Sequence, residues 1–161
     1  MKNMHHLDKE DIAILTALQS RARTSYNMIS QQTGIPTSTV HDRVKRFIEN
    51  GTIKGFIALI NEEAIGCTQV AIIGVETGAE LYSDVAHELT QMEEVVEVYG
   101  TTAQYDLMIK IRTYNRPHLG KTLNKIRSIR GVHDINIASI IEAFKEEHTI
   151  PIMQEYVKVE K

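Results

Sequence analysis

Residues 25–51 read SYNMISQQTGIPTSTVHDRVKRFIENG, and this stretch decides the fold of the N-terminal part of the chain. Ser25 can cap the start of a short helix, and Gly34 supplies the left-handed residue at which such a helix ends. Pro36 then begins a second helix, which ends at Asn50-Gly51. The apolar residues of these helices are Met28 and Ile29 in the first and Val40, Val44, Phe47 and Ile48 in the second. Two short helices joined by a glycine-containing turn predict a helix-turn-helix.

A further helix is predicted in front of this pair. Asp8, followed by Asp11 three residues later, resembles a capping box. The apolar residues that recur there with helical spacing are Ile14, Leu15, Leu18 and Ala22, with Leu7 just before the cap. Asp11 falls within this apolar stripe. We therefore expect backbone N–H groups or an arginine of the same domain to hold its carboxylate.

The segment Thr52–Ile60 (TIKGFIALI) is rich in β-branched and aromatic residues, with Gly55 as a bend. It predicts a wing or hinge strand. The polar stretch 61–66 ends in glycine and marks a boundary. We therefore expect a winged helix-turn-helix domain over residues 1–60 and a second domain over residues 61–161.

The second domain has the pattern βαββαβ. Strands are expected at 69–75, 95–99, 105–111 and 132–143, and helices at 80–92 and 116–129. Each helix is followed by a similar acidic or glycine turn and a strand, so the two halves predict a ferredoxin-like split sheet. The fold class is thus α+β. Two helices cover one sheet face, and the other face needs a partner, for which a second copy of the chain is the simplest choice.

The charge is unevenly distributed along the 161 residues. The chain carries a net charge of -3, but residues 1–60 hold eight Lys and Arg against five Asp and Glu, so the acidic excess lies in the remainder. A hydrophobic content of 42% with 24% charged residues is ordinary for a globular protein and does not indicate disorder. No apolar run is long enough to span a membrane, and the start MKNMHHL lacks the apolar core of a secretory signal. Cys67 is the single cysteine, so a cytoplasmic location is expected.

The solvent face of the helix after Pro36 predicts contact with double-stranded DNA. The candidate DNA-binding residues are Thr37, Ser38, Thr39, Asp42, Arg43, Lys45 and Arg46. Hydroxyl groups can reach base edges or phosphates, and cationic side chains suit phosphates. Arg43 lies at the border of the apolar face and could bind guanine. Asp42 and Glu49 give the face mixed charge, which leaves open a solvated face on an interaction module.

The chain resembles the Lrp/AsnC (feast–famine) transcription regulators over nearly its whole length. The resemblance rests on Leu7-Asp8-x-x-Asp11-x-x-Ile14-Leu15-x-x-Leu18-Gln19, Gly34-Ile35-Pro36-Thr37-Ser38-Thr39-Val40, Arg43-Val44-Lys45-Arg46-Phe47 and Gly51-x-Ile53-Lys54-Gly55-Phe56. It implies homodimers that assemble further, often into octamers. It also implies amino-acid effectors bound between C-terminal domains.

The family's effector motif has the form Gly-x-(Tyr/Phe)-Asp, in a turn between the middle strands. The matching residues here are Thr101, Thr102, Ala103, Gln104, Tyr105 and Asp106. Tyr105 and Asp106 match, whereas Ala103 takes the place of glycine, which permits a positive φ and a close approach of ligand to backbone. Two roles stay open for Asp106: pairing with a ligand ammonium group or ordering the turn. A regulator without an effector is therefore an alternative.

An enzyme of another class is a second alternative, because small decarboxylases of the sirohaem pathway share this two-domain layout. That family is expected to carry histidine and arginine in the middle-strand turn, and residues 99–105 contain neither. The seven histidines show no metal-ligand spacing, and no catalytic constellation is evident. We expect no enzyme activity, catalytic residue, metal or cofactor. A metabolite-binding protein with a vestigial helix-turn-helix is a third class, which salt-dependent DNA binding would distinguish.

Overall fold

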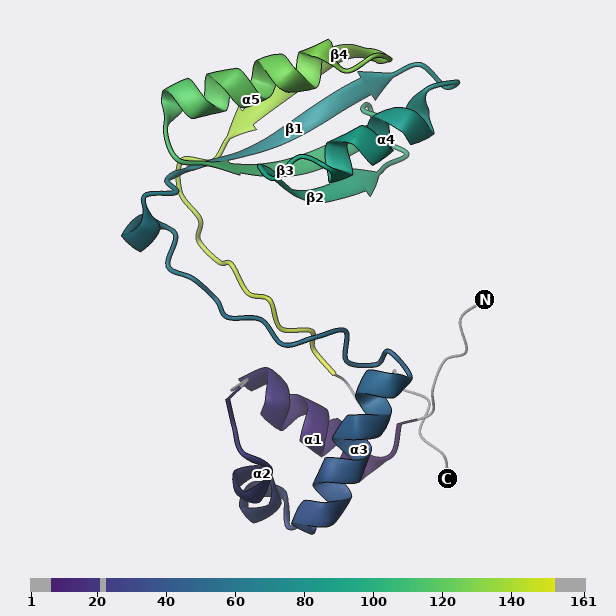
Figure 1. Ribbon diagram of the computed structural model, residues 1–161, viewed down its shortest axis with the longest axis vertical. Helices are drawn as coiled ribbons and strands as arrows, with labels where there is room; N and C mark the ends of the chain where they lie inside the picture. The colour runs from purple at the N-terminus through teal and green to yellow at the C-terminus, as the bar shows by residue number, and fades with distance from the viewer. Residues whose placement is uncertain (1–6, 21–22, 153–161) are drawn as a thin grey trace. The chain divides into compact units, whose positions relative to one another are not determined.

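The computed structural model describes residues 7–20 and 23–152 (Figure 1). Ala22 and the segment 153–161 lie outside the described residues. The chain divides into two compact units, of which one ends at Leu59 and takes in the tail from Glu146, while the other spans Ile60–Lys145. The tail differs from the expected domain assignment, which placed all of 61–161 together. It joins the first unit because Gln19 and the backbone of Ile150 exchange two hydrogen bonds, of 2.7 and 3.1 Å.

The first unit contains the three expected helices. They are α1 (Lys9–Ser20), α2 (Tyr26–Thr33) and α3 (Thr37–Glu49). The local signals act as predicted: the Ser25 hydroxyl accepts from the Met28 N–H, and Gly34 ends α2 at a φ of 75°. The side chains that form the core between the helices are Ile14, Leu15, Leu18, Ile29, Ile35, Val40, Val44 and Phe47. Two of the apolar helix residues stay largely in solvent, since Met28 is 42% and Ile48 51% exposed.

The predicted strand at Thr52–Ile60 is wrong for the single chain. The structure assigns no strand to these residues, and within the described chain no neighbouring strand pairs with them. A strand needs the N–H and C=O groups of a neighbour, which sequence composition cannot supply. Ile57 and Leu59 are 70% and 68% exposed. The segment therefore has the composition of a strand without a partner in its own chain.

The second unit has the expected ferredoxin-like arrangement. Its elements are β1 (Gln69–Thr77), α4 (Tyr82–Thr90), β2 (Val95–Gly100), β3 (Leu107–Thr113), α5 (Arg116–Ser128) and β4 (Val132–Ser139), after a short 3-10 turn at Glu63–Ile65. The sheet order is β2-β3-β1-β4, and β1 pairs antiparallel with both β3 and β4. Both helices lie on the same side of the sheet (Figure 1).

Alternation along the strands places the core on the helix side of the sheet. Leu107, Ile109 and Ile111 are buried, whereas the residues between them are half-buried, the period of two that a strand with one covered face shows. On the opposite face Ile72 is 37% exposed. The bounds differ from the expected ones at all four strands. β1 and β2 end later, at Thr77 and Gly100, β3 spans Leu107–Thr113 rather than 105–111, and β4 ends at Ser139 rather than at residue 143. The two residues cut from the start of β3, Tyr105 and Asp106, thereby belong to the turn that precedes it.

Candidate nucleic-acid interface and effector turn

The start of α3 presents small hydroxyl side chains. Thr37 and Ser38 are exposed and Thr39 is half-buried. Pro36 is the N-cap and has no side chain that can accept from the first-turn N–H groups. The first turn of a helix combines orphan N–H groups with the positive end of the helix dipole, which favours anions such as DNA phosphates. This end of α3 can therefore accept a phosphate and still present hydroxyls to neighbouring groups.

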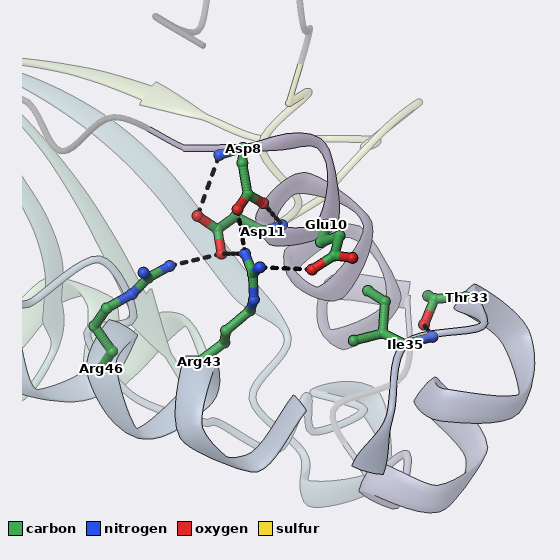
Figure 2. A network of polar contacts seen from close by, with 7 residues as sticks. All are labelled: Asp8, Glu10, Asp11, Thr33, Ile35, Arg43 and Arg46. Atoms are coloured by element: carbon green, nitrogen blue, oxygen red, sulfur yellow. Dashed lines mark hydrogen bonds and ion pairs between the residues drawn. The ribbon is translucent and has the colours of Figure 1, made fainter. Parts of the chain in front are cut away.

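Arg43 is held by three carboxylates of α1 and its cap (Figure 2). Its guanidinium donates to Asp8 and Asp11 through Nη1 and to Glu10 through Nη2, each at 2.5 Å. The Arg43 side chain is only 19% exposed. Arg43 therefore connects α3 to α1. This differs from the sequence-based expectation, which placed Arg43 on the solvent face of the helix.

Asp11 is the buried centre of this ion cluster. Its side chain is 2% exposed and accepts from Arg43 and from Arg46 Nη2, the latter at 2.6 Å. Asp11 and Asp8 also bond each other's backbone N–H groups, at 3.2 and 2.7 Å, which completes the capping box. Both partners expected for Asp11, backbone amides and an arginine, are thus confirmed. Arg46 remains 52% exposed, so it can contact Asp11 and a phosphate together.

Asp8 and Arg43 stabilise each other's charged forms. Burial opposes the charge on Asp8, but hydrogen bonds from Arg43 and the backbone outweigh it and hold the pKa of Asp8 below its ordinary value. Burial likewise opposes the charge on Arg43, and its bonds to Asp8 and Asp11 raise the pKa of the guanidinium above its ordinary value. Contact between Arg43 and a base would require breaking these interactions.

The centre of the α3 surface is more exposed and of mixed charge. The side chains of Asp42 and Lys45 are 80% and 67% exposed. His41, which the sequence argument did not select, is 60% exposed and lies edge-on to the Tyr26 ring, with centroids 5.8 Å apart. Its helical position, one turn after Thr37, was the signal that could have found it.

The candidate effector turn is closed by its own hydrogen bonds. The Thr101 hydroxyl donates to the Tyr105 carbonyl at 2.5 Å and accepts from the Ala103 N–H at 3.2 Å. The Thr101 N–H donates to the Asp106 carbonyl at 2.9 Å. No non-glycine residue of the described chain has a positive φ, so Ala103 occupies the position of the family's glycine without backbone strain. Thr102 and Gln104 are exposed.

Asp106 and Tyr105 both contact β1. The Asp106 carboxylate accepts from the Thr77 N–H at 2.8 Å, next to the register shift between Glu76 and Thr77 in the pairing of β1 with β4. The Tyr105 ring lies against Gly74: a Cβ at that position would come within 2.4 Å of the ring. Both residues of the turn thus contact the same strand, β1. Asp106 orders the turn whether or not it also binds a ligand.

Comparison with known proteins identifies the chain. The description Lrp/AsnC ligand binding domain matches residues 70–150, and a winged helix-turn-helix DNA-binding domain matches residues 7–54. The HTH-type transcriptional regulator FL11 of Pyrococcus furiosus is 39% identical over 146 residues, which are 91% of this chain and 97% of that protein. The chain belongs to the Lrp/AsnC family.

Solved Lrp/AsnC structures share the fold. E. coli AsnC has a TM-score of 0.84 and 28% identity, over 91% of this chain and 99% of AsnC. A feast or famine regulatory protein from M. tuberculosis, complexed with L-methionine, has a TM-score of 0.83 and 23% identity, over 89% and 98% of the two chains. The second match is a likeness of fold.

Membership of the Lrp/AsnC family settles the class of function. The similar proteins carry the names of transcription regulators with helix-turn-helix domains, so this chain is a DNA-binding transcription regulator rather than a decarboxylase. Within the described residues, no helix is long and apolar enough to cross a membrane. Over the same residues, no group of three His, Cys, Asp or Glu side chains is placed to hold a metal ion.

Proposed function

We propose that this Lrp/AsnC protein is a sequence-specific regulator whose α3 enters the major groove of double-stranded DNA. The observation that carries the proposal is the division of α3 into two faces. Val40, Val44 and Phe47 are fully buried, while the opposite side presents Ser38, Lys45 and the half-exposed Arg46 to solvent. Such a helix has one face for its own core and one for a groove.

The candidate residues divide into three roles. Thr37, Ser38 and Thr39 reach base edges or phosphates from the first turn, and Lys45 and Arg46 contact phosphates. Asp42 lies among them on the same exposed face. Arg43 differs, because its guanidinium is engaged by three carboxylates; we assign it to holding α3 against α1.

We further propose that the protein works as a homodimer. Two features support this: the exposed apolar segment at Ile57 and Leu59, and a sheet face without helices that carries the exposed Ile72. A dimer places two helix-turn-helix units on two DNA half-sites. This raises the affinity for DNA beyond what the few phosphate contacts of one unit give. Assembly to an octamer rests on the family resemblance alone. A cytoplasmic location follows from the proposed partner, DNA.

The proposed regulator responds to an amino acid bound at the turn before β3. The M. tuberculosis protein complexed with L-methionine supports it, as do Tyr105 and Asp106, which match the effector motif. The Asp106 carboxylate would pair with the ligand's ammonium group while it holds the Thr77 N–H. The alternative is a regulator without an effector, which Ala103 and the closed turn favour.

The test is binding of the purified protein to its own promoter region, by mobility shift at 50 and 200 mM salt, with and without a panel of amino acids. Four phosphate contacts in a dimer predict a loss of affinity of roughly a hundredfold between these concentrations. Selective binding shifted by an amino acid supports the whole proposal, and selective binding without a shift supports the regulator without an effector. Absence of selective binding refutes the proposal.

Two α3 variants test the roles of individual residues. Arg46→Ala should weaken binding to cognate and random DNA alike, because a phosphate contact carries no base information. Ser38→Ala should change the preference among sequences. Equal losses on both DNAs for both variants would argue against this division of roles. The unfolding midpoint of each variant must be measured too, since Arg46 also bonds Asp11.

A further inference from the structure

We propose that Asp42 is a specificity-determining residue that accepts a hydrogen bond from the exocyclic amino group of a cytosine in the major groove. The inference rests on the proposed DNA-binding role of α3. It adds to that role a named base and a named atom. It also accounts for an acidic side chain on a surface that must approach phosphates.

Asp42 occupies the outermost line of α3. It lies two residues after Val40 and two before Val44, both of them fully buried, so it points away from the core. Its side chain is 80% exposed. A residue at this place on a helix in the groove faces the base edges, whereas residues at the two flanks face the phosphate strands.

The Asp42 carboxylate makes few contacts within the fold. The other acidic side chains of residues 7–59 are bound by cations: Asp8, Glu10 and Asp11 by Arg43 at 2.5 Å, and Glu49 by Lys45 at 3.9 Å. Within the described chain, the one polar partner of the Asp42 carboxylate is the exposed ring of its neighbour His41, whose Nδ1 lies 3.3 Å from Oδ1. Removal of the Asp42 charge should therefore leave the fold unchanged.

A carboxylate restricts which DNA groups can lie beside it. It accepts hydrogen bonds and donates none, so phosphate oxygens and the acceptor atoms N7 and O6 of guanine are unfavourable neighbours. Cytosine presents its N4 amino group as a donor. Adenine presents the N6 amino group beside the acceptor N7, a pattern that suits an amide better than a carboxylate. Asp42 thus favours cytosine, and Asp42→Asn would favour adenine.

The experiment is selection of binding sites from a randomised DNA pool by the full-length wild type, Asp42→Asn and Glu49→Gln. The last is a matched control because it removes the same charge from the same side of α3, two turns away. We expect the wild type to require cytosine at one position of each half-site and Asp42→Asn to lose that requirement and gain adenine. Glu49→Gln should keep the wild-type site.

Affinities on the selected sites complete the test. Replacing the cytosine pair should weaken wild-type binding roughly tenfold and leave Asp42→Asn nearly unaffected. Both variants should bind random DNA somewhat more tightly, because each removes one negative charge near phosphates. An unchanged preference in Asp42→Asn, or the same change in Glu49→Gln, overturns the inference. Failure of the wild type to select any site would refute the proposed function itself.

Discussion

The guanidinium of Arg43 lies 2.5 Å from the carboxylate of Asp11, although 32 positions separate the two residues in the sequence. The pair joins the middle of α3 to the first turn of α1, at a site where Asp11 is 2% exposed. The sequence pattern places Arg43 among the DNA contacts. In the structure it instead holds α3, the proposed DNA-contacting helix, against α1. The stability of the helix-turn-helix unit and the presentation of its proposed DNA-binding face are therefore coupled.

Removal of the Arg43 guanidinium should destabilise the protein. Arg43→Met should lower the free energy of unfolding by about 3 kcal/mol, because Asp11 is left buried with Arg46 as its remaining cation. Urea unfolding of the full chain, followed by circular dichroism, measures the loss. Lys45→Met is the control: its ion pair with Glu49 is about two-thirds exposed, so we expect a change below about 0.5 kcal/mol. Similar effects of the two variants would contradict the proposed role of Arg43 in holding α3 against α1.

Glu94 gives a prediction for the dependence of stability on pH. Its carboxylate, 11% exposed, accepts from Lys125 at 3.0 Å and from His118 Nε2 at 3.2 Å, both on α5. Burial opposes its charge, but hydrogen bonds from its own backbone, Lys125 and His118 lower its pKa to about 2, against an ordinary value of 4.5. Because the native pKa is depressed, this contribution is complete above about pH 4.5 and is lost as the pH falls toward 2.

Glu94→Gln should accordingly destabilise the protein at neutral pH and less so in acid. We expect a loss of about 2 kcal/mol at pH 7, reduced from the full linkage value because Lys125 is 62% exposed. Urea titrations at pH 7, 4 and 3 should show the difference from wild type shrinking. Glu88→Gln on the exposed side of α4 removes the same charge and should show no such trend. A difference that stays constant with pH would exclude the assigned ion pairs.

The contact between Gly74 and Tyr105 predicts a compensating pair of substitutions. Gly74→Ala places a Cβ within 2.4 Å of the ring and should cost about 1–3 kcal/mol, because the ring must move. In a Tyr105→Ala background the same change should cost much less. A double-mutant cycle of unfolding free energies measures this coupling. Additive effects would mean that the ring does not occupy the space above Gly74.

Asp106 allows its structural and ligand roles to be separated. Asp106→Asn keeps an oxygen that can accept from the Thr77 N–H, so stability should change by less than about 0.5 kcal/mol. Asp106→Ala loses that bond and should cost about 1 kcal/mol. If an amino acid binds at this turn, both variants should lose the response in the mobility shift, because neither carries the charge that pairs with an ammonium group. A response retained by Asp106→Asn would place the ligand elsewhere.

Local signals in the sequence determined much of the fold. The caps at Ser25 and Asp8 and the left-handed Gly34 were predictable because each acts on atoms within about four residues. The alternation of β3 was predictable because the side-chain period of a strand is fixed by its geometry. The βαββαβ order and the apolar stripe of α3 followed from the same periodicities. These features require no knowledge of which elements meet.

Features that depend on distant partners were decided by the tertiary structure alone. The sequence places Arg43 at the border of the apolar face of its helix. Only the packing of α1 on α3 shows that three carboxylates surround it. The Tyr105 ring reaches Gly74, 31 positions earlier, because β3 pairs with β1. Thr52–Ile60 has the composition of a strand but forms none, because strand formation depends on hydrogen bonds to a neighbour and not on the side chains of the segment itself.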